Sequence, residues 1–392
     1  MSISANLTTE FNSIFNTTTT PRIFFAPGRI NLIGEHTDYN GGHVFPASIS
    51  YGTYALGRKR YDQKLRFYSM NFPDNGIIEC DLSDLSFDES DSWANYPKGI
   101  ILYLQKAGHE IASGADILFY GNIPNGAGLS SSASIEIATG ILVNELFNIN
   151  LERIPIIQIG QKVENNYICV NSGIMDQFAI GMGKKEHAIL LNCQTLDYKY
   201  APIKLDDYLI VIINTNKHRT LAGSKYNERR AQCEQALSDL QQENSIISLG
   251  ELTLAEFEKN KHLIKNEINR KRAKHAVYEN ARTLVAFEKL QQGDLQGFGK
   301  LMNDSHISLR DDYEVTGLEL DTVVQAAWEQ DGVIGARMTG AGFGGCAIAI
   351  VAKDKVTDFK ENINSIYHYT IGYDATFYAA SIGDGAKELI EE

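Results

Sequence analysis

The chain has 392 residues, of which 43% are hydrophobic and 22% charged, and its formal net charge is −13. This composition can build one or two globular domains with large apolar cores. The acidic balance argues against nucleic acid or an anionic membrane as the main partner, because both are polyanions. Five cysteines without a CxxC pair are typical of a reduced, cytoplasmic protein. The N-terminal segment lacks the basic and apolar regions of a signal peptide.

Short apolar runs bounded by turn residues predict buried strands. They fall at 22–26, 115–121, 187–193, 208–214, 346–352 and 376–381. Amphipathic periodicity predicts four helices. The first follows the serine run at 130–132, and the others cover 151–170, 228–242 and 274–291. The irregular mixture indicates an α+β or mixed α/β fold. The strand pattern fades at 195–207, and we expect a domain boundary there, between residues 1–203 and 204–392.

Three glycine-rich segments could bring the backbone close to a phosphate group. The segment GTYALGRK (52–59) has P-loop spacing but lacks the P-loop lysine, so we expect a turn between strands. GAGFGG (340–345) precedes a strand-like run, which excludes a dinucleotide site and leaves a tight turn or close approach to a ligand. PNGAGLSSSASIEIATG (124–140) follows a strand and opens a helix, so it favours anion binding over a simple serine cap. The basic run NRKRAK (269–274) is expected to be a solvated helix start.

Polar side chains interrupt the apolar, glycine-marked segment 27–49, which carries Arg29, Glu35, His36 and Asp38. Motifs of metalloproteases, serine hydrolases and protein kinases are absent from the sequence. A phosphate-binding loop, this polar cluster and Asp176 suit phosphoryl transfer to a small molecule. From the residues alone, Arg29 and Asp176 could equally form a structural ion pair. A metal site at Glu35, His36 and Asp38 is disfavoured, because no second His or Cys cluster completes it.

Five segments resemble a known enzyme family. GRINLIGEHTDYNGG (28–42) is similar to the signature of galactokinases, and NSGIMDQFA (171–179) and SKYNERR (224–230) resemble further galactokinase segments. PNGAGLSSSAS (124–134) and MTGAGFGGCAIAIV (338–351) resemble motifs of the wider GHMP kinase superfamily. The resemblance implies a two-domain GHMP-kinase fold with the active site in the interdomain cleft. It also implies ATP- and Mg²⁺-dependent phosphorylation of α-D-galactose at O1, the first committed step of galactose catabolism.

The resemblance also implies a role for individual residues. The catalytic pair is Arg29, which stabilises the transferring phosphoryl group, and Asp176, a base or an orienting carboxylate. The implied sugar-binding positions are Glu35, His36, Asp38, Gly173, Asp176 and Tyr226. The implied phosphate contacts are Gly126, Gly128, Ser130, Ser131 and Ser132. The implied Mg²⁺ ligands are Ser132 and Glu164. Trp93 lies near the adenine site by analogy with the family.

Two alternatives to an active galactokinase remain open. A kinase for a related sugar, such as N-acetylgalactosamine or arabinose, could share these motifs. A galactose- and ATP-binding sensor without activity is disfavoured, because the serine-alanine end of the phosphate loop is intact and Arg29 and Asp176 are both present. We expect a cytoplasmic monomer whose partners are galactose and ATP.

Overall fold

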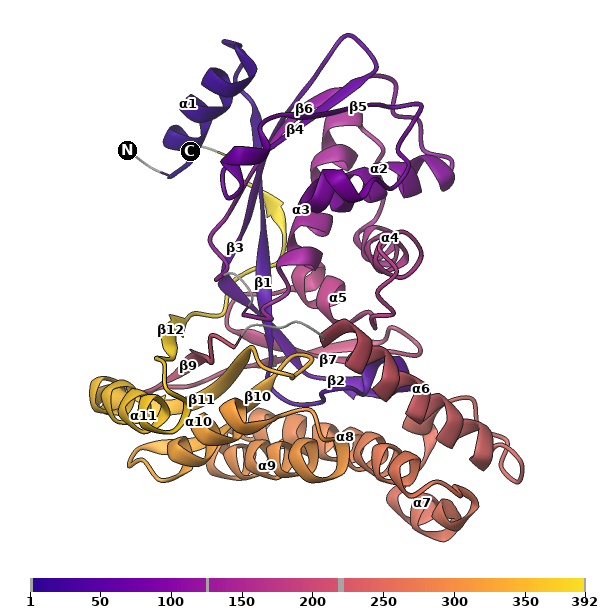
Figure 1. Cartoon of the computed structure of the whole chain (residues 1–392), viewed down its shortest axis with the longest axis vertical. Helices are drawn as coiled ribbons and strands as arrows, with labels where there is room; N and C mark the ends of the chain where they lie inside the picture. The colour runs from indigo at the N-terminus through magenta and orange to yellow at the C-terminus, as the bar shows by residue number, and fades with distance from the viewer. Residues whose placement is uncertain (1–2, 125–126, 218–221, 391–392) are drawn as a thin grey trace.

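Two main β-sheets, each covered by helices, organise the chain in a computed structural model that describes residues 3–124, 127–217 and 222–390. In Figure 1 the first sheet stands upright in the upper part of the molecule, and the second lies below it. Strand β1 (Arg22–Asn31) runs down from the first sheet towards the second. The architecture is mixed α/β, as the sequence predicts.

The first sheet has six strands in the order β13-β1-β3-β6-β4-β5. Their bounds are Pro46–Lys59 for β3, Lys64–Ser69 for β4, Ile78–Asp81 for β5, Ala115–Gly121 for β6 and Lys387–Glu388 for β13. The C-terminal strand β13 therefore returns to pair antiparallel with β1. One face carries helices α2 (Asn95–Lys106), α3 (Ser131–Phe147), α4 (Arg153–Asn166) and α5 (Met175–Met182). The opposite face packs against helix α1 (Ile3–Phe15) through Leu7, Phe11 and Phe15.

The second sheet is antiparallel, in the order β10-β11-β9-β12. Its strands are β9 (Tyr208–Asn214), β10 (Val333–Thr339), β11 (Cys346–Ala352) and β12 (Thr376–Ala380). The helices of this part are α6 (Ala222–Leu240), α7 (Leu254–Asn260), α8 (Glu267–Gln291), α9 (Leu295–Ser308), α10 (Leu318–Trp328) and α11 (Val356–Ile371). A third, small sheet consists of β2 (His43–Val44), β7 (His187–Asn192) and β8 (Tyr198–Pro202), and it packs against α8.

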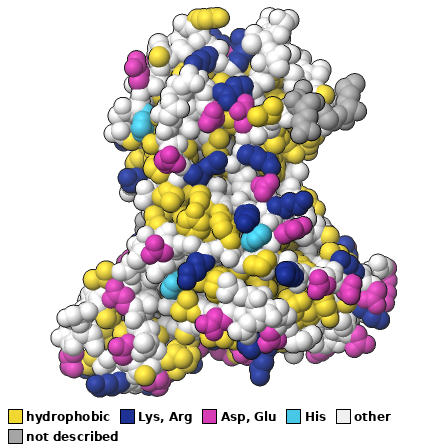
Figure 2. All heavy atoms as spheres, turned by 180° about the vertical axis from the view of Figure 1, so that it is seen from behind, with side chains coloured by type: hydrophobic (Ala, Val, Ile, Leu, Met, Phe, Trp, Pro, Cys, Tyr) yellow, Lys and Arg dark blue, Asp and Glu magenta, His cyan; other side chains and the backbone are white. Residues whose placement is uncertain are grey.

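A shared apolar core joins the two main parts of the molecule. Ile30 and Leu32 from β1 and the segment after it cluster with Ile212 of β9 and Phe298 of α9, and all four are buried. Figure 2 shows the molecule from behind, with hydrophobic side chains gathered at the narrow waist between two broader ends. Burial of this apolar surface holds the two sheets in a fixed relation, which places the segment after β1 between them.

All six predicted strands are present, and the four predicted helices are α3, α4, α6 and α8. Two predictions are wrong. Residues 52–59 form no turn, because they continue strand β3. The basic run at 269–274 does lie at the start of α8, as predicted, but it is not solvated throughout, since Arg272 is buried and paired with Glu314. Helix α1 was not predicted, and the domain boundary at 203/204 stays a prediction.

Across the described ranges, no helix is both long and apolar enough to cross a membrane.

Candidate active site

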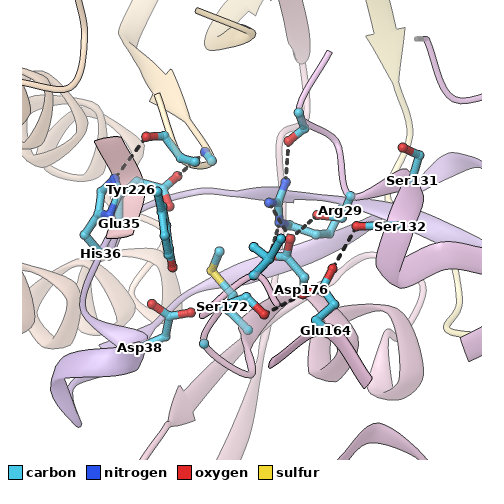
Figure 3. A pocket seen from close by; sticks show the side chains of 17 residues that line it. Arg29, Glu35, His36, Asp38, Ser131, Ser132, Glu164, Ser172, Asp176 and Tyr226 are labelled. Atoms are coloured by element: carbon cyan, nitrogen blue, oxygen red, sulfur yellow. Dashed lines mark hydrogen bonds and ion pairs between the residues drawn. The ribbon is translucent and has the colours of Figure 1, made fainter. Parts of the chain in front are cut away.

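A cavity of about 340 Å³ lies between the two main parts of the molecule (Figure 3), in the usual size range of small-molecule sites. Segments that are distant in sequence meet there: the chain after β1, the start of α3, the start of α5, α6 and the turn between β10 and β11. Twelve predicted site residues line it, namely Arg29, Glu35, His36, Asp38, Gly128, Ser130, Ser131, Ser132, Glu164, Gly173, Asp176 and Tyr226. The remaining one, Gly126, lies outside the described residues.

Arg29 and Asp176 form a two-pronged ion pair at the centre of this cavity. Arg29 Nε donates to Asp176 Oδ1 at 2.8 Å, and Nη2 donates to Oδ2 at 2.9 Å. Arg29 Nη1 donates to the Gly128 carbonyl at 2.9 Å, and the Ser130 hydroxyl donates to Asp176 Oδ2 at 2.5 Å. The Arg29 side chain is 5% exposed and that of Asp176 is 28% exposed. The guanidinium is thus rigidly held, while the carboxylate still faces the cavity.

The loop before α3 curls tightly around this pair. Ser130 is the N-cap residue of α3 and has a left-handed backbone, with φ 64°. Ser131 and Ser132 begin the helix, where free N–H groups and the helix dipole favour an anion. Gly28 permits the close approach of β1, because a Cβ there would lie 2.7 Å from the Leu129 carbonyl oxygen. The loop before α3 and Arg29 are therefore positioned together.

A buried carboxylate, Glu164, lies beside the start of α3. The Ser132 hydroxyl donates to its Oε1 at 2.9 Å, and the Ser172 hydroxyl donates to its Oε2 at 2.5 Å. Burial raises the pKa of Glu164, and the hydrogen bonds from Ser172 and Ser132 oppose that rise. The sequence did not single out Ser172, although it directly precedes Gly173. A hydroxyl and one carboxylate are the hard oxygen ligands that suit Mg²⁺ together with nucleotide phosphates.

Glu35 is almost fully buried, with 1% of its surface exposed. Its Oε1 accepts from the Gly340 backbone N–H at 2.7 Å, and its Oε2 accepts from Asn31 Nδ2 at 2.8 Å. Gly340 belongs to the glycine-rich turn between β10 and β11 and has φ 85°. The backbone of this turn therefore closely approaches the Glu35 carboxylate.

His36 is a neutral, fully engaged imidazole. Its Nε2 donates to the Ala341 carbonyl at 3.2 Å, so Nδ1 accepts from the Tyr39 hydroxyl at 2.8 Å. Burial lowers the pKa of His36 to about 3, which keeps the ring neutral. Tyr226 lies against the ring with centroids 5.5 Å apart. Because both ring nitrogens have protein partners, His36 faces the cavity as an aromatic wall.

Asp38 and Gly173 meet on the far side of the cavity. A Cβ at Gly173 would lie 1.8 Å from Asp38 Oδ2 and 2.2 Å from its Cγ, so only glycine admits the carboxylate there. Burial raises the pKa of Asp38 to about 7, and the nearby Asp176 charge adds to the rise. Gly173 thus acts on the cavity by making room for Asp38.

A second cavity of about 240 Å³ opens beside the first. It is lined by Trp93, Tyr96 and Phe72, and it shares Ser131 and Ser132 with the first cavity. The Trp93 Nε1 group is buried and has no hydrogen-bond partner within the described part of the chain. The family resemblance named Trp93 alone; Phe72 and Tyr96 were missed, because Phe72 follows β4 whereas Trp93 and Tyr96 follow β5.

Three family models match the chain. The galactokinase galactose-binding signature covers residues 9–59, the GHMP kinase N-terminal domain covers 95–184, and the GHMP kinase C-terminal domain covers 286–368. The galactokinase of Ligilactobacillus salivarius (strain UCC118) is 58% identical over 93% of this chain and 95% of its own length. That of Lactiplantibacillus plantarum (strain ATCC BAA-793 / NCIMB 8826 / WCFS1) is 57% identical over 98% of this chain and 100% of its own length.

Solved structures agree with these matches. The crystal structure of Lactococcus lactis galactokinase complexed with galactose superposes with a TM-score of 0.97 at 53% identity, covering 99% of this chain and 100% of that one. The Methanococcus jannaschii mevalonate kinase has a TM-score of 0.66 at 20% identity, covering 94% of this chain and 100% of that one, which indicates a shared fold.

Proposed function

Because this chain belongs to the galactokinase family of sugar kinases, we propose that it transfers the γ-phosphoryl group of ATP to O1 of α-D-galactose. The products are galactose 1-phosphate and ADP. The observation that carries the proposal is the pairing of Arg29 with Asp176 directly beside the phosphate loop, in a cavity of a size suited to one sugar. The galactose complex of the Lactococcus lactis relative supports the choice of sugar.

Asp176 orients the attacking hydroxyl. Its two oxygens are held by Arg29 and Ser130, so the carboxylate cannot rotate freely. One rigid acceptor at the reacting hydroxyl lowers the entropic cost of reaching an in-line geometry. The same carboxylate can take the hydroxyl proton as the phosphoryl group arrives.

Arg29 stabilises the charge of the transferring group. The guanidinium binds Asp176 through Nε and Nη2 and the Gly128 carbonyl through Nη1. One N–H on Nη1 and one on Nη2 remain to meet phosphoryl oxygens. A buried, preorganised cation is worth more than one in water, because the surroundings screen it less. The backbone amides at the start of α3 supply the other donors.

Glu35, Asp38 and Tyr226 surround the remaining sugar hydroxyls. Carboxylate oxygens accept from hydroxyl groups in defined directions, which lets the site read the stereochemistry of a hexose. Gly173 contributes by admitting Asp38. Tyr226 closes the cavity from α6.

Ser132 and Glu164 would hold Mg²⁺. No three His, Cys, Asp or Glu side chains of the described ranges group so as to bind a metal on their own. That fits a Mg²⁺ ion whose shell is completed by nucleotide phosphates and water. When bound, the ion neutralises phosphate charge. Ser172 orients Glu164 for this role through its 2.5 Å hydrogen bond.

The aromatic cavity beside Ser131 and Ser132 is the proposed adenine site. Trp93, Tyr96 and Phe72 offer apolar surface for a purine ring. We further propose that the protein is a cytoplasmic monomer.

A sugar panel tests the proposed function. ADP release from ATP and Mg²⁺ is followed with galactose, N-acetylgalactosamine, arabinose and glucose as acceptors. We expect turnover with galactose at the highest kcat/KM. Turnover of another sugar without galactose would assign a related kinase, and galactose binding without ADP release would assign a sensor.

A further inference from the structure

Glu35 is joined to strand β10 by a fully buried arginine. Arg337 is 0% exposed, and its Nη1 lies 3.2 Å from Glu35 Oε1. The same nitrogen donates to the Asn31 carbonyl at 3.0 Å, and Nε donates to the Ser305 hydroxyl at 3.2 Å. Arg337 thus holds Glu35 and the chain leading to it from one fixed point.

Arg337 also lies near a second buried carboxylate, Glu279 of α8, with 3.9 Å between Nη2 and Oε1. Glu279 has independent support, because it pairs with Arg282 and accepts from Ser305 at 2.5 Å. Although burial opposes ionisation, Arg282 first, then His275, Arg337 and Ser305, lower the pKa of Glu279 to about 2, so Arg337 is not its main support. Burial raises the pKa of Glu35 despite the attraction of Arg337 and, more weakly, Arg29. Of the two carboxylates, Glu35 therefore depends more on Arg337.

We propose that Arg337 is a positioning residue of the sugar site, which holds the Glu35 carboxylate in place as a charged hydrogen-bond acceptor for galactose. The inference rests on the proposed function. Arg337 lies behind Glu35 and is not among the cavity-lining residues, so it acts through Glu35. A buried carboxylate deprived of its arginine takes up a proton, and a protonated Glu35 loses part of its acceptor capacity.

The other titratable groups around Glu35 leave no substitute for Arg337. His275 donates its Nε2 proton to the Glu35 carbonyl, and burial lowers the pKa of His275 to about 4, so its ring is neutral. Arg29 is committed to Asp176. Among the described residues, the charged and titratable groups that face this network are Arg29 from β1, His36 and Asp38 from the following loop, His275 and Glu279 from α8, and Arg337 from β10.

Arg337→Met tests the proposal, with Arg282→Met as its matched control. Both variants remove an arginine from the same buried network, but Arg282 pairs with Glu279 and not with Glu35. We expect Arg337→Met to raise the galactose KM by about ten- to a hundred-fold, as expected for a lost charged hydrogen bond. The rise grows as pH falls, because Glu35 becomes protonated, while the ATP KM changes less than about threefold. Arg282→Met should show no such added pH dependence.

Glu35→Gln separates this role from a purely structural one. Asp38 titrates in every variant, so only the pH dependence that Arg337→Met adds is informative. That added dependence should disappear in the Arg337→Met/Glu35→Gln double variant, and its galactose KM should not exceed that of Glu35→Gln by more than about threefold. Arg337→Lys keeps the charge and should recover most of the galactose affinity. Arg337→Gln, which removes the charge but keeps hydrogen-bonding groups, takes the place of Arg337→Met if that variant does not fold.

Equal pH profiles of the galactose KM in wild type and in the variant that removes the charge, Arg337→Met or Arg337→Gln, would overturn the inference, as would fully additive effects in the double variant. Failure of the proposed function is a different result, since wild type would then release no ADP with galactose. Circular dichroism of each variant at each pH confirms that folded protein is compared.

Discussion

Gly173→Ala places a methyl group where Asp38 now lies. The new Cβ would be 1.8 Å from Asp38 Oδ2, 2.2 Å from Cγ and 2.9 Å from Cβ. Because the Asp38 Cβ is also too close, rotating the carboxylate cannot fully relieve the clash. The carboxylate or the backbone must shift by about 1 Å, a displacement that can cost on the order of 100-fold in a preorganised site. We expect the galactose KM to rise by about 10- to 100-fold.

Initial rates of ADP release at varied galactose and varied ATP measure this effect. The ATP KM should change by less than about twofold, because the three atoms nearest to the new Cβ all belong to Asp38. Gly383→Ala is the matched control, since its Cβ would meet nothing closer than 3.6 Å. An unchanged galactose KM in folded Gly173→Ala protein would refute the reasoning that Gly173 acts by admitting Asp38.

Three further predictions concern catalysis, buried charge and the nucleotide. Asp176→Asn should lower kcat by at least about 10²-fold while calorimetry still detects galactose binding, and near-normal turnover would remove Asp176 from the mechanism. Burial raises the pKa of Glu136 well above its ordinary value, so the folded protein retains a proton that the unfolded chain releases above about pH 4.5. Wild-type stability therefore falls as pH rises, by up to about 1.4 kcal/mol per pH unit from this group. Glu136→Gln lacks this pH-dependent loss of stability, so its thermal midpoint should exceed that of wild type by an amount that grows from pH 5 to pH 8. A difference in midpoint that does not change with pH would contradict a neutral Glu136. Trp93→Ala should raise the ATP KM by about tenfold with little change in the galactose KM, and the opposite pattern would exclude the aromatic cavity as the adenine site.

The sequence predicted strands best where apolar residues run without interruption. Residues 208–214 form β9 because both faces of that strand are buried, which a continuous apolar run describes well. Strand β3 escaped prediction because its glycines resemble turn residues. In the structure Gly52 and Gly57 are close-packing positions, since a Cβ would lie 2.2 Å from the Ala26 carbonyl oxygen or 2.9 Å from Leu142.

Residue types and family motifs predicted which polar side chains would line one cavity, but not how they are supported. Arg272 belongs to a basic run, and its burial depends on Gln232 and Glu314, about 40 residues away in either direction. Likewise, Arg337 precedes a recognised glycine motif, and only the folded chain shows it beside Glu35. Such partners come from separate elements, so local periodicity carries no signal for them.

The central claim is that this chain phosphorylates the anomeric hydroxyl of galactose. Phosphorus and proton NMR of the product formed from galactose, ATP and Mg²⁺ test it directly, because the phosphorus–proton coupling identifies the carbon that bears the phosphate. The account predicts α-galactose 1-phosphate in amounts equal to the ADP released. A phosphate on another carbon, or ADP release without a phosphorylated galactose, would contradict it.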